Sequence, residues 1–499
     1  MTLGLSKGWI VGIENARSRA VARASAEHAG AAHASVQACM VRHPDGGPAY
    51  RAFAALRRCR LLILISALAI AMAAFPAICR AQTGGLGFLT GGTFSYGFGT
   101  SGNGLVVVGQ SGAPGFNASQ PPPYGGEAVL WNLPNAEAIQ ALGVLAGGTF
   151  SIAYGTNYGT NNTSGSVVVG ESGATNFSTG KGFIWTAANG MEDLGTLAGG
   201  TFSFAYSVNA NSTSTLNAIA VGQSGSTQFP LGEAFIWQSG TMTGLGALTG
   251  DNSSTALGMT PDGTVVVGYS RTSNGSAEQA FRWTSTTGMV GLGTLTGGTQ
   301  SYAQATNSDG SVIVGSSYAS GFPNGEAFRW TCTTASCSGG TMVGLCTIKG
   351  GTFSYATAVS ADGLVVVGES GSTAWPNGEA FIWTPSTGML SLQQVLSNAN
   401  LAGWNLTYAL GISADGTVIS GYGTNPSGQT QAWVAHYAGP GIATDSHDFN
   451  GDGYSDIAWR DTSGDVAIWL MNGTSILNPT ASYVGTVPTA WSIQGAGAD

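Results

Sequence analysis

Residues 292–330 carry the pattern that decides the fold: LGTLTGGTQSYAQATNSDGSVIVGSSYASGFPNGEAFRW. The run SVIVG at 311–315 is short, apolar and β-branched, as expected of a strand buried on both faces. Asp309-Gly310 precedes it and predicts a two-residue hairpin turn with positive φ at both positions. The stretch SYAQATN before the turn then becomes an antiparallel partner, and the alternating GEAFRW predicts a third strand.

The same phrases recur along the chain, which is its strongest signal. A Trp ends the third phrase at a mean spacing of about 50 residues, at 131, 185, 237, 283, 330, 383 and 433. An apolar run ending in Gly lies upstream of each Trp, at 105–109, 166–170, 218–222, 264–268, 311–315, 364–368 and 417–421. A phrase of the form GM-x-x-LG, often after a Thr-Gly or Asn-Gly turn, supplies a fourth strand. We therefore predict an all-β chain built as a seven-bladed β-propeller with four-stranded blades of about 50 residues; an open β-solenoid is the alternative.

The two ends of the repeat region predict how the ring closes. The seventh unit stops after Trp433-Val434-Ala435 without a fourth strand, and the first opens with a spare one at Leu86-Gly87-Phe88-Leu89. Pairing these segments would leave no open sheet edge. The Phe and Trp of the third phrase are predicted to form the core between blades, and Gly-Gly pairs such as Gly147-Gly148 to form turns.

Charge divides the chain into two unlike parts. Residues 1–81 hold 10 of the 16 basic side chains and three of the 25 acidic ones, which leaves six basic and 22 acidic residues beyond them. An acidic body with so few cations is a poor partner for nucleic acid. Arg57, Arg58 and Arg60 precede an apolar run, Leu61 to Ala74, followed by Pro76 and the small-residue site Cys79-Arg80-Ala81. These features predict a signal peptide cleaved after Ala81, with an uncleaved anchor as the alternative.

The predicted organisation has four segments. Residues 1–56 form an upstream extension, interpreted as a misplaced start or an extended signal region; residues 57–81 form the signal peptide. Residues 82–440 form the propeller, and residues 441–499 form a small C-terminal unit that could be truncated. Cleavage would leave a secreted chain without a stable membrane span. It would keep Cys332 and Cys337, which could staple a hairpin in an oxidising compartment, and Cys346, interpreted as a buried free thiol.

The phrases LGTLTGG, SxAxxxSxDGxVVVG and GEAFRW together resemble the HAF family of bacterial extracellular repeat proteins, over residues 84–437. The resemblance implies secretion and a propeller-like β fold, and it supplies no catalytic residues. The chain departs from the pattern at Asp251-Asn252-Ser253, at Leu345-Cys346 and around Trp404 and Tyr408.

A different motif, DFNGDGYSD at 448–456, follows Gly439-Pro440-Gly441. Side-chain oxygens at its first, third, fifth and ninth positions can converge on a hard cation, with a carbonyl at the seventh. Trp459 at position 12 argues against an EF-hand, and the runs IAWR and VAIWLMNG predict β-hairpins around the loop. The segment 445–499 resembles an FG-GAP or VCBS-type repeat, which implies Ca²⁺ held by Asp448, Asn450, Asp452, Tyr454 and Asp456.

Recognised catalytic motifs are missing from the sequence: it contains no HExxH, GxSxG or P-loop. Glu127, Glu233, Glu326 and Glu379 occupy equivalent positions, with Glu278 one place away, and could form either solvated strand ends or a rim for a cation or polar ligand. We therefore expect a secreted, non-enzymatic binding or structural surface module whose variable loops meet a glycan or a surface protein. The alternative is an extracellular hydrolase that acts on glycans and uses the propeller as its scaffold.

Overall fold

The computed structural model describes residues 83–112, 125–133, 139–158, 166–173, 179–209, 217–272, 278–319, 321–334, 337, 339–371, 378–396 and 401–437, and the backbone of five short strands between 457 and 486. All of these residues belong to one compact unit, Cys79–Asp499. The predicted extension 1–56 and signal peptide 57–81 lie outside them. Among the residues just given, the structure contains no helix with the length and apolarity of a membrane span.

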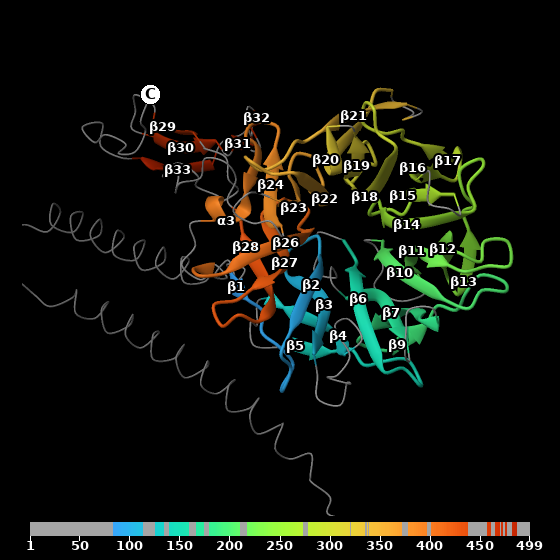
Figure 1. Ribbon diagram of the computed structural model, residues 1–499. Helices are drawn as coiled ribbons and strands as arrows, with labels where there is room; N and C mark the ends of the chain where they lie inside the picture. Colours follow the sequence, from blue (N-terminus) through green and yellow to red (C-terminus); the bar gives the residue numbers. More distant parts are fainter. Residues whose placement is uncertain are drawn as a thin grey trace, which may run out of the picture. The chain divides into compact units, whose positions relative to one another are not determined.

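Each repeat unit folds as four antiparallel strands, as the three phrases predict (Figure 1). The first strands are β2 Ser95–Thr100, β6 Phe150–Thr156, β10 Ser203–Val208, β14 Ser253–Met259, β18 Gln300–Thr306, β22 Phe353–Val359 and β26 Asn405–Ile412. The second strands, which contain the VVVG runs, are β3 Val106–Gly112, β7 Val167–Gly173, β11 Ile219–Ser224, β15 Val265–Arg271, β19 Val312–Ala319, β23 Val366–Gly371 and β27 Val418–Thr424.

The third strands carry the EAFxW phrase: β4 Gly126–Asn132, β8 Lys181–Thr186, β12 Glu233–Gln238, β16 Glu278–Thr284, β20 Phe322–Cys332, β24 Glu379–Thr384 and β28 Thr430–His436. The fourth strands are β5 Ile139–Ala141, β9 Gly190–Asp193, β13 Thr241–Gly244, β17 Gly288–Gly291, β21 Gly340–Gly344 and β25 Gly388–Ser391. A single parallel pair, Glu278 with Gln300, joins units 4 and 5 into one eight-stranded sheet. The short helix α3, Leu392–Val395, follows β25 and is capped by Ser391.

The last unit borrows its fourth strand from the start of the chain, as the prediction of a closed ring requires. The strand is β1, Gly84–Gly85, which pairs with Val434 and Trp433 of β28. The closing strand therefore begins two residues before the predicted segment 86–89. Leu86 donates its amide to Ala432 O at 2.9 Å, as Leu142 does to Ala128 O in unit 1. Ala414 N also donates to Gly102 O at 2.8 Å, so the first and last units are bonded at their turns as well.

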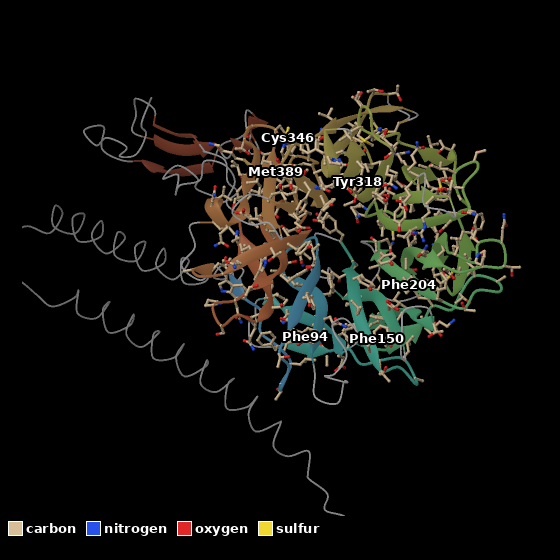
Figure 2. All side chains as sticks on the ribbon, in the orientation of Figure 1. Phe94, Phe150, Phe204, Tyr318, Cys346 and Met389 are labelled. Atoms are coloured by element: carbon tan, nitrogen blue, oxygen red, sulfur yellow. A yellow bond between two sulfur atoms is a disulfide. The ribbon has the colours of Figure 1, made fainter. Side chains whose placement is uncertain are left out.

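Apolar side chains fill the seams between neighbouring units, so the sheets pack face to face as the blades of a β-propeller (Figure 2). In the closing seam, Val107 and Trp131 of unit 1 pack with Val418 and Val434 of unit 7. Phe183, Phe235, Phe281, Phe328 and Phe381 are fully buried, which confirms the predicted core role of this Phe position. No unit could bury both faces of its sheet alone, because each seam takes side chains from two units.

Trp433 does not occupy the position that the Trp spacing predicts. It pairs with Gly421, whereas in unit 3 Phe235 pairs with the equivalent Gly222. Trp433 therefore takes the Phe position, where it is fully buried, and Ala435 takes the Trp position. The larger indole replaces the phenyl ring without loss of burial.

The Asp-Gly turns also differ from the prediction. Only the glycines have positive φ, for example Gly310 at 72° and Gly416 at 77°. The Asp is instead a hydrogen-bond acceptor within a longer loop: Asp309 Oδ1 receives Ser311 N at 2.9 Å, and Asp415 Oδ1 receives Thr417 N at 3.0 Å. These are Asx-type turns, in which the carboxylate imitates a backbone carbonyl.

A buried serine at the start of most first strands bonds its unit to the preceding one. Ser254 Oγ accepts Ala234 N of unit 3 at 2.8 Å and donates to Gly246 O at 2.5 Å. The same two bonds recur at Ser151, Ser203, Ser301 and Ser354, and Ser95 makes them with Ala432 and Gly87. We call these residues the seam serines.

Replacing Ser254 by Ala is expected to destabilise the protein by roughly 3 kcal/mol, because a buried amide and a buried carbonyl both lose their partner. Urea unfolding followed by tryptophan fluorescence measures the loss. Ser285→Ala, at an exposed turn, is the matched control and is expected to change stability by less than about 0.5 kcal/mol. Equal stability of the two variants would contradict this role.

Candidate functional site

The first strands of all units line one cavity of about 280 Å³. Its wall combines aromatic, aliphatic and hydroxyl side chains with the strand backbones. Because every unit contributes to it, this axial cavity is the place where side chains from distant parts of the sequence converge. The lining includes Phe98, Thr100, Tyr154, Thr156, Tyr158, Tyr206, Val208, Leu257, Met259, Pro261, Gln304, Thr306, Thr357, Val359, Leu410 and Ile412.

A β-bulge in each first strand turns one residue toward this cavity. In unit 3 the pairing with β11 shifts between Ala205 and Ser207, and Tyr206 is the residue left unpaired. Bulges commonly re-aim a side chain in this way. The equivalent residues all line the cavity: Phe98, Tyr154, Tyr206, Leu257, Gln304, Thr357 and Leu410.

Half-buried aromatic rings run from unit 7 through unit 3. Ring centroids of successive contacts lie 4.7 to 6.0 Å apart, in the order Tyr408, Tyr422, Tyr96, Phe98, Tyr154 and Tyr206. Such offset and tilted contacts stabilise beyond simple area burial. Of these rings, Phe98, Tyr154 and Tyr206 line the cavity. The bulge residues of units 4 to 7 are Leu257, Gln304, Thr357 and Leu410, so the lining is chemically asymmetric.

Two glutamates contact this row of aromatic rings, Glu171 at Tyr154 and Glu369 at Tyr408. Glu171 is fully buried; the Tyr154 hydroxyl donates to its Oε2 at 3.4 Å, and its Oε1 has no partner among the described residues. Burial raises the pKa of Glu171 from 4.5 to about 9. Glu369 is 5% exposed, and burial raises its pKa to about 7 against an opposing hydrogen bond from Tyr408. Glu171 is therefore a neutral acid at pH 7, and Glu369 titrates near that pH.

Glutamine occupies the same position in units 1 and 3. Gln110 Nε2 donates to Ser151 O at 3.0 Å, and Gln223 Nε2 donates to Ser254 O at 3.3 Å, in each case across the seam to the next unit. A protonated carboxyl has one O–H donor and can take the place of the amide N–H, whereas a carboxylate cannot. Of the two forms of Glu171, only the neutral one can donate a hydrogen bond as Gln110 and Gln223 do.

The pH dependence of stability follows in sign. Because both folded-state pKa values lie above the ordinary value of 4.5, the folded protein binds more protons than the unfolded chain between these limits. The contribution of the two carboxyl groups to stability is fully present below pH 4.5. It is lost as the pH rises, up to about 7 for Glu369 and about 9 for Glu171.

The double variant Glu171→Gln, Glu369→Gln is expected to melt close to the parent at about pH 5 and several degrees higher at about pH 9. Thermal melts by circular dichroism across this range measure the difference. Glu192→Gln, on the outer strand β9, is the control and should follow the parent. A pH profile of the double variant parallel to the parent's would contradict the burial argument.

Each of the five glutamates at or next to the equivalent position accepts a hydrogen bond, three of them from backbone amides. Glu127 accepts Gly143 N at 2.9 Å, Glu233 accepts Gly246 N at 3.0 Å, and Glu326 accepts Cys346 N at 3.0 Å. Glu379 accepts the Ser391 hydroxyl, and Glu278 accepts the Tyr302 hydroxyl of the next unit. Each carboxylate thus bonds a neighbouring segment of the chain, and the two interpretations, solvated strand ends and a ligand rim, stay predictions.

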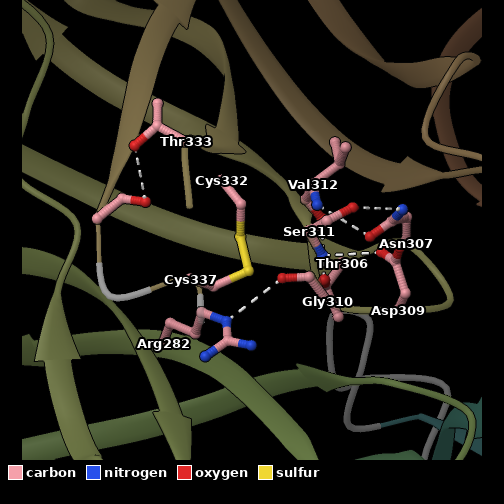
Figure 3. Close-up of a disulfide and its surroundings, with 11 residues drawn as sticks. Arg282, Thr306, Asn307, Asp309, Gly310, Ser311, Val312, Cys332, Thr333 and Cys337 are labelled. Atoms are coloured by element: carbon pink, nitrogen blue, oxygen red, sulfur yellow. Dashed lines mark hydrogen bonds between the residues drawn. A yellow bond between two sulfur atoms is a disulfide. The ribbon is translucent and has the colours of Figure 1, made fainter. Parts of the chain in front are cut away.

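Figure 3 shows a disulfide, Cys332–Cys337, and the hydrogen bond of Arg282 beside it. Cys332 and Cys337 form a disulfide, which confirms the proposed staple between β20 and β21. Cys346 is exposed rather than buried, because it replaces Gly in a turn and has φ 62°. Arg282 Nε donates to Gly310 O at 3.3 Å and Arg329 Nε to Gly363 O at 3.1 Å, so each arginine ties its unit to the next turn.

The predicted calcium ligands Asp448, Asn450, Asp452, Tyr454 and Asp456 lie outside the described residues. Strands β29, Ile457–Arg460, and β30, Asp465–Trp469, follow the loop and pair antiparallel, as the hairpin prediction requires. Strand β33, Ser482–Thr486, extends this sheet, and β31, Met471–Asn472, pairs with β32, Ser475–Ile476. Within the described part of the chain, no group of three or more His, Cys, Asp or Glu could hold a metal ion.

The cavity lining and the two buried glutamates were not predicted from the sequence. A signal for the glutamates was present, since VVVGE at 167–171 and 365–369 replaces VVVGQ at 106–110. The seam serines were part of a quoted phrase, but their partners lie on another unit. No sequence pattern located the bulges.

Comparison with known proteins gives a likeness of fold. No family model and no curated protein matches the chain. The solved structures similar to it include the putative TolB of Agrobacterium tumefaciens, with 12% identity, 61% of this chain and 95% of that chain covered, and a TM-score of 0.36. The Dos1 propeller has 10% identity, coverage of 68% and 95%, and a TM-score of 0.36. An oligogalacturonate lyase in complex with manganese has 12% identity, coverage of 72% and 94%, and a TM-score of 0.42. These likenesses assign no activity to this chain.

Proposed function

We propose that the chain is a secreted, non-enzymatic binding protein. In this proposal residues 82–440 form a seven-bladed β-propeller, of the HAF type that the repeats resemble, and the connections between strands bind an extracellular glycan or surface protein. Residues 441–499 form an FG-GAP or VCBS-like unit stabilised by Ca²⁺. The signal peptide at 57–81 directs export.

Three observations support the blade count. Each of the seven sequence units contributes four strands when β1 is assigned to the last one. Units 4 and 5 share a sheet through only one residue pair, so their four-stranded halves are separable. Every seam, including the one between units 7 and 1, has its own apolar cluster.

The observation that carries the binding function is the variation of one set of connections on a repeated frame. Between the second and third strands the chain spans two residues from Ala319 to Phe322 in unit 5, and thirteen from Gly112 to Gly126 in unit 1. Because the strands are antiparallel, these connections all leave the same end of their sheets. Variable loops on a constant scaffold are where recognition is usually located. The disulfide Cys332–Cys337 fits an oxidising, extracytoplasmic compartment.

Shortening residues 113–124 to a Gly-Ser linker is expected to reduce binding on a glycan array, or to surface proteins of the same cells, by about tenfold or more. The control replaces Ser285 and Thr286 by Ala, in a turn at the opposite end of the sheets. Undiminished binding by the shortened variant would contradict the assignment of the loops. Release of free sugar from an arrayed glycan would replace the proposal with the hydrolase alternative.

Calcium binding at the C-terminal unit has a separate test. The oxygen-rich donor set of Asp448, Asn450, Asp452, Tyr454 and Asp456 is of the kind that Ca²⁺ prefers. Calorimetry on the full chain is expected to show Ca²⁺ binding that is lost in Asp448→Ala, Asp452→Ala, together with a melting transition lowered by EDTA in the parent only. Absence of binding heat and an EDTA-insensitive melt would remove the site.

A further inference from the structure

The axial cavity has a chemical character that the loop-binding proposal does not use. Aromatic bulge residues from units 1, 2 and 3 form part of its wall, and Tyr158 adds a fourth ring. We propose that this cavity binds a small organic ammonium ion, with the Tyr158 hydroxyl accepting a hydrogen bond from the ligand N–H. The inference is independent of what the loops bind.

Tyr158 supplies the first argument. Its hydroxyl is buried and has no hydrogen-bond partner among the described residues, an uncommon state for a buried polar group. Burial and the negative charges of Asp415 and Asp362 raise the pKa of Tyr158, so the phenol stays protonated. A protonated phenol still has oxygen lone pairs, and a ligand with an N–H donor inside the cavity would satisfy them.

The distribution of charge supplies the second argument. Beyond residue 81 the chain has six basic side chains, and none of those that the structure describes lines the cavity. The turns at the ends of the first strands carry Asp262, Asp309, Asp362 and Asp415, all exposed. Acidic groups around a cavity of low polarity concentrate cations and repel anions. A carboxylate or phosphate ligand is thereby disfavoured.

The aromatic wall supplies the third argument. Phe98, Tyr154 and Tyr206 form a continuous run of ring contacts, with centroids 5.8 and 5.1 Å apart. A cation within about 6 Å of a ring centroid is attracted to the ring face, more strongly where water is excluded. The cavity volume of about 280 Å³ lies at the low end for ligand pockets, which restricts the ligand to a few carbon atoms.

The test compares three probes of similar size and different charge: n-butylammonium, 1-butanol and butyrate. Isothermal titration calorimetry on the full chain at low salt is expected to show millimolar or tighter binding of butylammonium, at least about tenfold weaker binding of butanol, and none of butyrate. Tyr158→Phe, which removes only the hydroxyl, is expected to weaken butylammonium binding by about tenfold. Tyr437→Phe, in the apolar seam of units 6 and 7, is the matched control and should bind as the parent does.

Each outcome decides the proposal. Equal affinity for butanol and butylammonium would show an apolar cavity without selection for charge and would overturn the ammonium assignment, as would no butylammonium binding at all. Unchanged affinity in both Tyr158→Phe and Tyr206→Leu would show that butylammonium binds outside the axial cavity and would overturn the proposal. If Tyr206→Leu fails to fold, the charge series on the parent and the Tyr158→Phe comparison still decide the question.

Discussion

The seam serines hold the structure in register. Each one accepts an amide from the third strand of the preceding unit and donates to the carbonyl of the turn that connects the two units. One hydroxyl therefore satisfies two buried backbone groups that no sheet ladder reaches. The apolar residues of the seam tolerate small shifts because they are non-directional, whereas these bonds fix how far one sheet advances past the next. Unit 7 has Thr407 at this position, and there α3 and the Ser391–Glu379 bond occupy the seam instead.

The same constraint positions the cavity. The bulged residue follows the seam serine by three positions, as in Ser203 and Tyr206 or Ser301 and Gln304. In the six units that have a seam serine, the serine anchors the strand to the previous unit, so the bulge falls at the same height around the axis. Side chains from units far apart in sequence thus line the same axial cavity. The glutamates one strand further out adjoin this cavity and experience the loss of solvent that raises their pKa.

Most of the strands could be predicted from the sequence because each unit repeats the same strand pairings. The VVVG and EAFxW phrases have the same partners in every unit, so their alternation predicted the strands. The strand left over at each end of the repeats predicted the closing pair, two residues away from its position in the structure. The prediction failed where strand register or burial, which the phrases do not encode, sets the position or the charge of a residue. Trp433 takes the Phe position because pairing with Gly421 sets the register, not the spacing of tryptophans. Glu171 stands where unit 1 has Gln110, and its burial, which the sequence does not encode, is what makes it a neutral acid.

Positions that repeat from unit to unit support the fold, whereas positions that vary can determine which ligand binds. Seam positions repeat as Ser, Val and Phe because they meet the same surroundings each time, but the bulge positions are Phe, Tyr, Tyr, Leu, Gln, Thr and Leu. If these residues served packing alone, identical backbones would favour one residue type at all of them. Their differences break the rotational symmetry of the cavity, with aromatic rings on units 1 to 3 and aliphatic or polar groups opposite. A small ligand off the axis needs such an asymmetric wall, because a symmetric ring offers several equivalent poses and strong preference for none.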